Sequence, residues 1–524
     1  MAVDLAPPPP VDTRPEKTTN LGPLTRTASW NAAASILNYA VRVGTRLVIT
    51  PILVTGLGQT LFGVWEILGR VGSYASAEGQ PTHALRLVIA QEQSETNHEP
   101  KRRVIGAALA IWLFAIPLLI GLGVVFAWLA PTLTQSPPAL HTEVRLTCGL
   151  LVGTLIISAL TSVPQSALFG MNMGYKRMGW QAAISIVGGA GAAGAVALGF
   201  GLPGLGAASI LTALTATACY FVLVRHYLPW FGVARPSRTE ITSLFGMTAW
   251  LSTGNLIAKV ALASDIVILG AIAAPAVVTT YVLTGYAART AIGIHVFATS
   301  AAIPGLGGVL GIRQFDRARR ARAELLLLTW LFATIVGVNV LLWNRSFLNI
   351  WVGAENYAGL WVDVLIVLIA VQTAFIRVDA FVIDAMLRPR VRVIVAAIAA
   401  VVTLVAAIAL TWRYGVIGLA CGMILGRLIQ SVAYPLLVRS QLSNGARPFR
   451  VSVTRLVAVS VLLLAGSAIL GQRLEAGGWI VWGIGLITSF GVSAAMAFAL
   501  GPTREARQVL MQRIRALAAT GGSR

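Results

Sequence analysis

Residues 29–55 read SWNAAASILNYAVRVGTRLVITPILVT. The segment is apolar and long enough to cross a bilayer core of about 30 Å as a helix. Its polar residues Ser35, Asn38, Arg42 and Arg46 recur at steps of three or four, so they lie on one face of that helix. A membrane helix with a charged face predicts either a polar space inside the protein or anionic partners on other helices.

The two arginines need compensation, because a charge at mid-membrane costs at least about 2.5–3.5 kcal/mol on insertion scales. We expect their face to line a water-filled cavity. The alternative is an ion pair with a carboxylate on another span, for which Glu66 and Asp379 are candidates. The sequence leaves this alternative open.

The rest of the chain has the composition of a membrane protein. Apolar residues make up 56% of the 524 residues and charged residues 11%, against about 25% in a soluble domain. This excludes a water-soluble enzyme. The apolar segments lack the strict alternation of a transmembrane barrel. We therefore predict an all-α polytopic membrane protein with about 14 transmembrane helices of about 20 residues each. The expected spans are 29–55, 60–78, 104–130, 143–164, 179–199, 205–224, 246–272, 277–303, 323–343, 359–383, 393–411, 416–438, 453–471 and 479–500.

The basic residues predict the orientation. The net charge of +21 does not call for a nucleic-acid partner, because Lys and Arg gather on cytoplasmic loops. With this map only Arg345, Arg413 and Arg473 fall in outside segments, and both termini are predicted to be cytoplasmic. We expect no cofactor, no metal site and no catalytic group. The cysteines lie inside spans, and the histidines form no ligand pattern.

An internal repeat divides the chain. Ser35-x2-Asn38-x3-Arg42 recurs as Ser252-x2-Asn255-x3-Lys259, and the turn Gly201-x2-Gly204-Leu205 recurs as Gly415-x2-Gly418-Leu419. Two halves of six spans each insert with the same orientation and are related by a pseudo-two-fold axis along the membrane normal. We expect Arg42 and Lys259 to face each other across that axis. The predicted domains are a disordered cytoplasmic tail (1–25), an N-lobe (26–240), a C-lobe (241–445), two extra spans (446–501) and a basic amphipathic cytoplasmic tail (502–524).

Other spans also carry charges. Glu66 and Arg70 are spaced for a helical ion pair, and a cavity role is an equal alternative. Asp265 lies on the helix face opposite Lys259, which favours a packing or helix-end role over coupling to an ion. Arg289 is a further cavity candidate, Asp379 fits a local polar network, and Arg427 is expected to reach the cytoplasmic interface.

The sequence resembles the polysaccharide-exporter branch of the multidrug/oligosaccharidyl-lipid/polysaccharide (MOP) flippase superfamily, which includes Wzx-type O-antigen flippases and the lipid II flippase. The resemblance spans roughly residues 25–500. It is carried by Asn31 to Pro51, Leu61-Phe62-Gly63, Gly170 to Arg177, Asp265 with Tyr281, and the two Gly-x-x-Gly-Leu turns.

The resemblance implies a V-shaped bundle of two lobes around a central cavity, in the cell inner membrane. It implies movement of an undecaprenyl-pyrophosphate-linked oligosaccharide to the outer leaflet for O-antigen, capsule or exopolysaccharide synthesis, with a glycan polymerase or glycosyltransferases as candidate partners. The matching helices carry Arg42, Arg46, Arg70 and Arg289. The two extra spans would form a groove for the lipid tail.

The candidate cavity residues are thus Ser35, Asn38, Arg42, Arg46, Arg70, Asn255, Lys259 and Arg289, and the candidates for ion coupling are Glu66, Asp265 and Asp379. One alternative is a multidrug or cation antiporter of the same superfamily, which predicts an acidic cavity. Another is a membrane enzyme of glycan assembly, which needs a larger outside loop than residues 344–359 provide.

Overall fold

The computed structural model describes residues 21–74, 81–93, 95–300, 303–386, 389–442 and 452–521, and every regular element within them is helical. The α-helices are α1 Leu21–Tyr74, α2 Pro81–Gln91, α3 Glu99–Leu133, α4 His141–Gly170, α5 Gly174–Ala197, α6 Gly201–Tyr227, α7 Arg238–Ala263, α8 Asp265–Ile272, α9 Pro275–Thr284, α10 Tyr286–Ser300, α11 Ile303–Gly311, α12 Phe315–Trp351, α13 Leu360–Ala385, α14 Pro389–Gln441, α15 Val453–Gly471, α16 Trp479–Leu500 and α17 Arg504–Gly521. Short 3-10 turns, η1 Pro138–Leu140 and η2 Ala354–Asn356, connect some of them.

These helices confirm the all-α membrane prediction. Within the described residues, 11 helices are long and apolar enough to cross a membrane. Two of them each contain two expected spans, because α1 turns sharply at Gly58 and α14 at Gly415. The expected span 246–272 is divided between α7 and α8, and the expected span 277–303 between α9 and α10. The chain is a multi-pass membrane protein.

The first described helix begins at Leu21, inside the expected tail 1–25. Residues 1–20 of that tail lie outside the described part.

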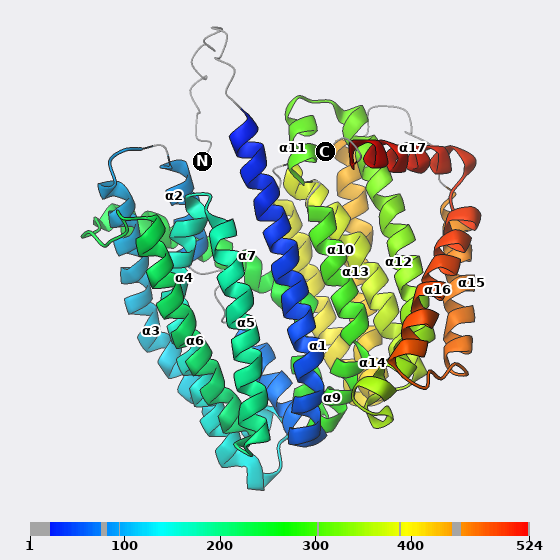
Figure 1. Ribbon diagram of the computed structural model, residues 1–524, viewed down its shortest axis with the longest axis horizontal. Helices are drawn as coiled ribbons and strands as arrows, with labels where there is room; N and C mark the ends of the chain where they lie inside the picture. Colours follow the sequence, from blue (N-terminus) through cyan, green and yellow to red (C-terminus); the bar gives the residue numbers. More distant parts are fainter. Residues whose placement is uncertain are drawn as a thin grey trace.

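The helices form two groups that converge at one end (Figure 1). Helices α3 to α6 pack together on one side, and α10 and α12 to α16 on the other. Helix α1 runs between them and packs against α5 on one side and against α8 and α9 on the other. Helix α7 contacts α14 as well as α2 and α3, so it also joins the groups.

Apolar side chains seal the end where the groups converge. Leu53 and Leu57 of α1 share a buried cluster with Val196 of α5, Leu283 of α9 and Trp351 of α12. The indole nitrogen of Trp351 also donates a hydrogen bond to the carbonyl of Leu47, 2.7 Å away. The two groups are thus closed against each other at this end.

The opposite end holds the described ends of the chain, the start of α1 and helix α17 (Figure 1). Helix α17 lies across the bundle, with Ala506 and Leu510 packed against Trp330 of α12 and Leu456 of α15. Helices α15 and α16 pack along α12 through buried polar contacts, such as Asn339 Nδ2 to Ser493 Oγ at 3.0 Å. The common end agrees with termini on one side of the membrane, and the compartment stays a prediction.

The repeated glycine turns share one backbone feature, a glycine with positive φ. Gly201, which begins α6, has φ of +56°, and Gly415, at the turn inside α14, has φ of +57°. Both lie in the left-handed region, which L side chains rarely adopt. Three residues on, a Cβ on Gly204 would meet Phe200 at 2.5 Å, and one on Gly418 would meet Tyr414 at 3.0 Å. In both copies of the sequence repeat, a glycine with positive φ is therefore followed three residues later by a closely packed glycine.

Local sequence also fixes where α7 starts. The hydroxyl of Ser237 accepts a hydrogen bond from the backbone nitrogen of Glu240 at 3.2 Å. The Glu240 carboxylate accepts one from the backbone nitrogen of Ser237 at 2.7 Å. This reciprocal capping box satisfies two helix-end donors, and Arg103 of α3 reaches the same carboxylate at 3.1 Å.

We predict that Gly418→Ala destabilises the protein. A methyl group there would overlap the carbonyl oxygen of Leu410, which is backbone and cannot turn away. Overpacking of this kind costs about 1–3 kcal/mol. Gly466→Ala on α15 is the control, because nothing lies within 4 Å of its Cβ position. Thermal unfolding of the detergent-purified variants measures the difference, and equal midpoints would contradict the packing argument.

The topology gives a second prediction. Reporter fusions after residues 320 and 503 should both report the cytoplasm, since the start of α12 and helix α17 lie at the same end of the bundle (Figure 1). A fusion after residue 477, in the turn between α15 and α16, should report the opposite side. Periplasmic reporter activity from the fusion after residue 320 would contradict the predicted topology.

Candidate functional site

A polar cavity of about 540 Å³ lies between α1, α5, α9 and α10. Its volume is within the range of small-ligand sites, roughly 300–1,000 Å³. Its lining residues include four arginines and one glutamate: Arg42, Arg46, Arg70, Arg289 and Glu66. The arginine side chains that the sequence assigned to three separate spans thus lie around one space.

The first helix contributes two arginines with different surroundings. Arg46 forms an ion pair with Glu66 at 3.3 Å, so the ion-pair alternative applies to this residue. Arg42 is exposed in the cavity, 5.9 Å from the centre of the Tyr39 ring, and forms no ion pair with any described residue. Glu66 is bound by Arg46 and not by Arg70, its helical neighbour.

Asp265 holds Arg289 in place. The Asp265 carboxylate accepts a hydrogen bond from the Tyr281 hydroxyl at 2.9 Å and lies 3.6 Å from Arg289 Nη2. The Arg289 guanidinium stacks over the Tyr281 ring at 4.9 Å and donates to the carbonyl of Val282 at 3.0 Å. Asp265 and Tyr281, two of the residues on which the family resemblance rests, are therefore in direct contact. Its effect is to fix the guanidinium at the cavity wall.

A smaller cavity of about 150 Å³ adjoins the first, and Arg70 and Arg289 line both. Arg427 of α14 also lines it and donates a hydrogen bond to Thr373 at 2.8 Å. Arg427 is only 2% exposed, so the expectation that it extends to the cytoplasmic interface is wrong. The glycines before it, Gly418, Gly422 and Gly426, let the two arms of α14 pack closely against each other across the turn at Gly415.

Several candidates lie elsewhere. Ser35 donates to the sulfur of Met178 at 3.3 Å, and Asn38 is buried, and neither lines the cavity. Asp379 accepts two hydrogen bonds from Arg322 at 2.7 and 3.0 Å, so its partner lies on the neighbouring helix α12 and not on its own span. The side chains of Asn255 and Lys259 lie outside the described residues, so the facing of Arg42 and Lys259 stays a prediction.

Sequence reasoning missed most of the uncharged lining. The cavity wall also includes Tyr39, Thr45, Trp65, Tyr286 and Thr290. Thr45 has the spacing of the polar face of α1, but the aromatic residues have no signal that separates them from packing residues. Two of them join α1 to α10: the Tyr39 hydroxyl donates to the Thr290 carbonyl at 3.0 Å, and the Tyr286 hydroxyl to the Val43 carbonyl at 3.2 Å.

The fold of this chain is found in solved transporters. The structure of the lipid II flippase MurJ in an inward closed conformation aligns with a TM-score of 0.67 at 12% identity, covering 89% of this chain and 97% of that one. This chain has the MOP transporter fold. An inward-facing multidrug resistance MATE transporter of the MOP superfamily gives a TM-score of 0.61 at 15% identity, over 77% of this chain and 98% of that one.

The likeness is one of fold. A MATE structure in complex with MaD3S aligns with a TM-score of 0.56 at 16% identity, over 82% of this chain and 99% of that one. No protein-family model matches the sequence, and no curated protein sequence matches it. These structural neighbours are transporters and not enzymes. They include both a lipid flippase and drug transporters, so the substrate has to be argued from the cavity.

We predict that Arg289→Ala lowers the amount of folded protein more than Arg289→Met combined with Asp265→Leu. Removing one partner of a buried pair leaves an uncompensated charge and costs roughly 3–5 kcal/mol, whereas apolar replacement of both partners is often neutral. Size-exclusion profiles of the fluorescently tagged variants measure this. If the double variant is the less abundant one, the two residues do not act as a pair.

Proposed function

We propose that the protein moves a lipid-linked oligosaccharide, joined through a pyrophosphate to a polyprenyl tail, from the inner to the outer leaflet. The observation that carries the proposal is the charge of the cavity wall, which has four arginines and a single glutamate. Arginine forms bidentate, charge-assisted hydrogen bonds to phosphate. A pyrophosphate in this space would compensate charges that the protein leaves in excess.

The uncharged part of the wall suits the remainder of such a substrate. Threonine, serine and tyrosine hydroxyls beside the arginines can exchange hydrogen bonds with sugar hydroxyls, and tyrosine and tryptophan rings offer apolar faces. The cavity is too small for a long glycan, so the outer sugars would extend from it. In this proposal α15 and α16, which lie outside the repeat, guide the lipid tail along α12.

The contacts disfavour the multidrug or cation antiporter. A cationic drug or a coupling ion needs a carboxylate that is open to it. Glu66 is bound by Arg46, and Asp265 is held by Arg289 and Tyr281. Asp379 is held by Arg322. The proposed mechanism therefore assigns the three carboxylates to positioning arginines.

Arg42 supplies the test. Because it forms no ion pair with a described residue, its removal should not destabilise the fold. We predict that Arg42→Ala and Arg42→Glu abolish surface glycan in the native cell at near-normal protein abundance. Arg42→Lys should retain part of the export, since the charge remains and the fork is lost. Surface polysaccharide and protein level are measured together.

Arg145→Ala is the matched control, because Arg145 is also an exposed arginine on a spanning helix and does not line the cavity. Normal surface glycan from an abundant Arg42→Glu variant would contradict the proposal. Increased tolerance of cationic drugs on overexpression, with unchanged surface glycan, would favour the antiporter.

A further inference from the structure

A second group of arginines lies outside the central cavity, around the aromatic ring of Phe169 near the end of α4. The guanidinium carbon of Arg86, on α2, lies 4.2 Å from the ring centre, and that of Arg177, on α5, also lies 4.2 Å from it. The two carbons are therefore separated by no more than twice that distance. Two positive charges from different helices are held at one ring.

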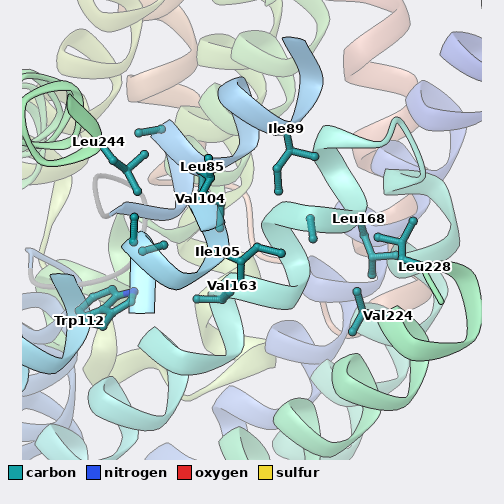
Figure 2. Packing of buried hydrophobic residues seen from close by; sticks show 14 of the residues in the cluster. Leu85, Ile89, Val104, Ile105, Trp112, Val163, Leu168, Val224, Leu228 and Leu244 are labelled. Carbon is teal, nitrogen blue, oxygen red and sulfur yellow. The ribbon is translucent and has the colours of Figure 1, made fainter. Parts of the chain in front are cut away.

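Packing fixes the position of the helix that carries Arg86. Leu85 and Ile89 of α2 are fully buried in the apolar core of the first lobe, which includes Ile105 of α3 and Leu168 of α4 (Figure 2). A Cβ at Gly170 would meet Ile89 at 2.7 Å and the carbonyl oxygen of Arg86 at 3.0 Å. Helix α2 thus lies directly against the end of α4. This packing places Arg86 next to Phe169.

The positive charges at this ring have no carboxylate between them. Neither Arg86 nor Arg177 forms an ion pair within the part of the chain that the structure describes. The hydrogen-bond partner of Arg177 is the neutral side-chain oxygen of Gln165, at 2.8 Å. Like charges held this close repel each other, and an anion that contacts both would remove the repulsion.

This group is close to the central cavity. Ser35 of α1 bonds to Met178 of α5, directly after Arg177, and Arg42 lies two turns further along α1 and lines the cavity. Helix α2 and the start of α5 lie toward the end of the bundle that carries the chain termini (Figure 1). A lipid headgroup bound at Phe169 would therefore lie near the part of α1 that leads to the cavity wall.

We propose that Arg86, Arg177 and Phe169 form a docking site for the diphosphate of a polyprenyl lipid, separate from the central cavity. The ring covers one side of each guanidinium, and the guanidinium nitrogens other than Nε of Arg177, which is buried, remain to donate hydrogen bonds to phosphate oxygens. Two guanidiniums match the two phosphate groups better than the single phosphate of a phospholipid. The choice of a polyprenyl diphosphate rests on the proposed function.

Native mass spectrometry of the full-length, detergent-purified protein tests this site, because it counts bound lipids. The probes are undecaprenyl diphosphate, phosphatidylglycerol and phosphatidylcholine. The variant Arg86→Gln with Arg177→Gln should bind one undecaprenyl diphosphate fewer than the wild type. Arg86→Lys with Arg177→Lys should give intermediate occupancy. Arg225→Gln is the matched control, because Arg225 is an exposed arginine stacked at 4.6 Å on Phe221 in the same lobe, and it should leave the count unchanged.

Thermal unfolding of the same samples separates loss of the site from loss of the fold. An unchanged lipid count in a stable double glutamine variant would overturn the inference and leave the central cavity untouched. If the double glutamine variant loses as much bound phosphatidylglycerol as bound undecaprenyl diphosphate, the assignment to a diphosphate is overturned. The site would then bind anionic lipids in general. Absence of undecaprenyl diphosphate binding to the wild type, relative to phosphatidylcholine, would overturn the proposed function as well.

Discussion

Positive charge inside a membrane has to be compensated, and the interior of this protein is arranged around that requirement. The cost of a bare charge at mid-membrane is several times the thermal energy. The chain meets it in three ways. Arg46 has a carboxylate partner, Glu66. Arg289 has a carboxylate, an aromatic face and a backbone carbonyl. Arg42 faces open cavity space.

The fold brings four helices, α1, α5, α9 and α10, together around one cavity. Helix α1 is hydrogen-bonded to α10 through Tyr39 and Tyr286 and to α12 through Trp351. It therefore presents its polar face between the two groups of helices. The positions of Arg70 and Arg289, shared by the large and the small cavity, connect this face to the interior of the second group.

The sequence predicted the helices, the cavity arginines and the repeated turns because each has a local periodic signal. The spacing of Arg42 and Arg46 shows their common helix face without any knowledge of neighbours. The choice of ion-pair partner for each charged side chain has no such local signal. Glu66 lies at the ideal helical spacing from Arg70, yet it bonds to Arg46 across the turn at Gly58. The burial of Arg427 has no local signal for the same reason, since its hydrogen-bond partner Thr373 is far away in sequence.

The apolar seal formed by Leu53, Leu57, Leu283 and Trp351 would make any opening of the lobes at this end depend on temperature. Parting the lobes at this end would expose buried apolar side chains to water, and such exposure carries a positive heat-capacity change. The enthalpy of opening therefore rises with temperature. Hydrophobic stabilisation weakens on cooling, so the closed end is held less firmly in the cold. Rates that depend on opening would follow curved and not straight Arrhenius plots.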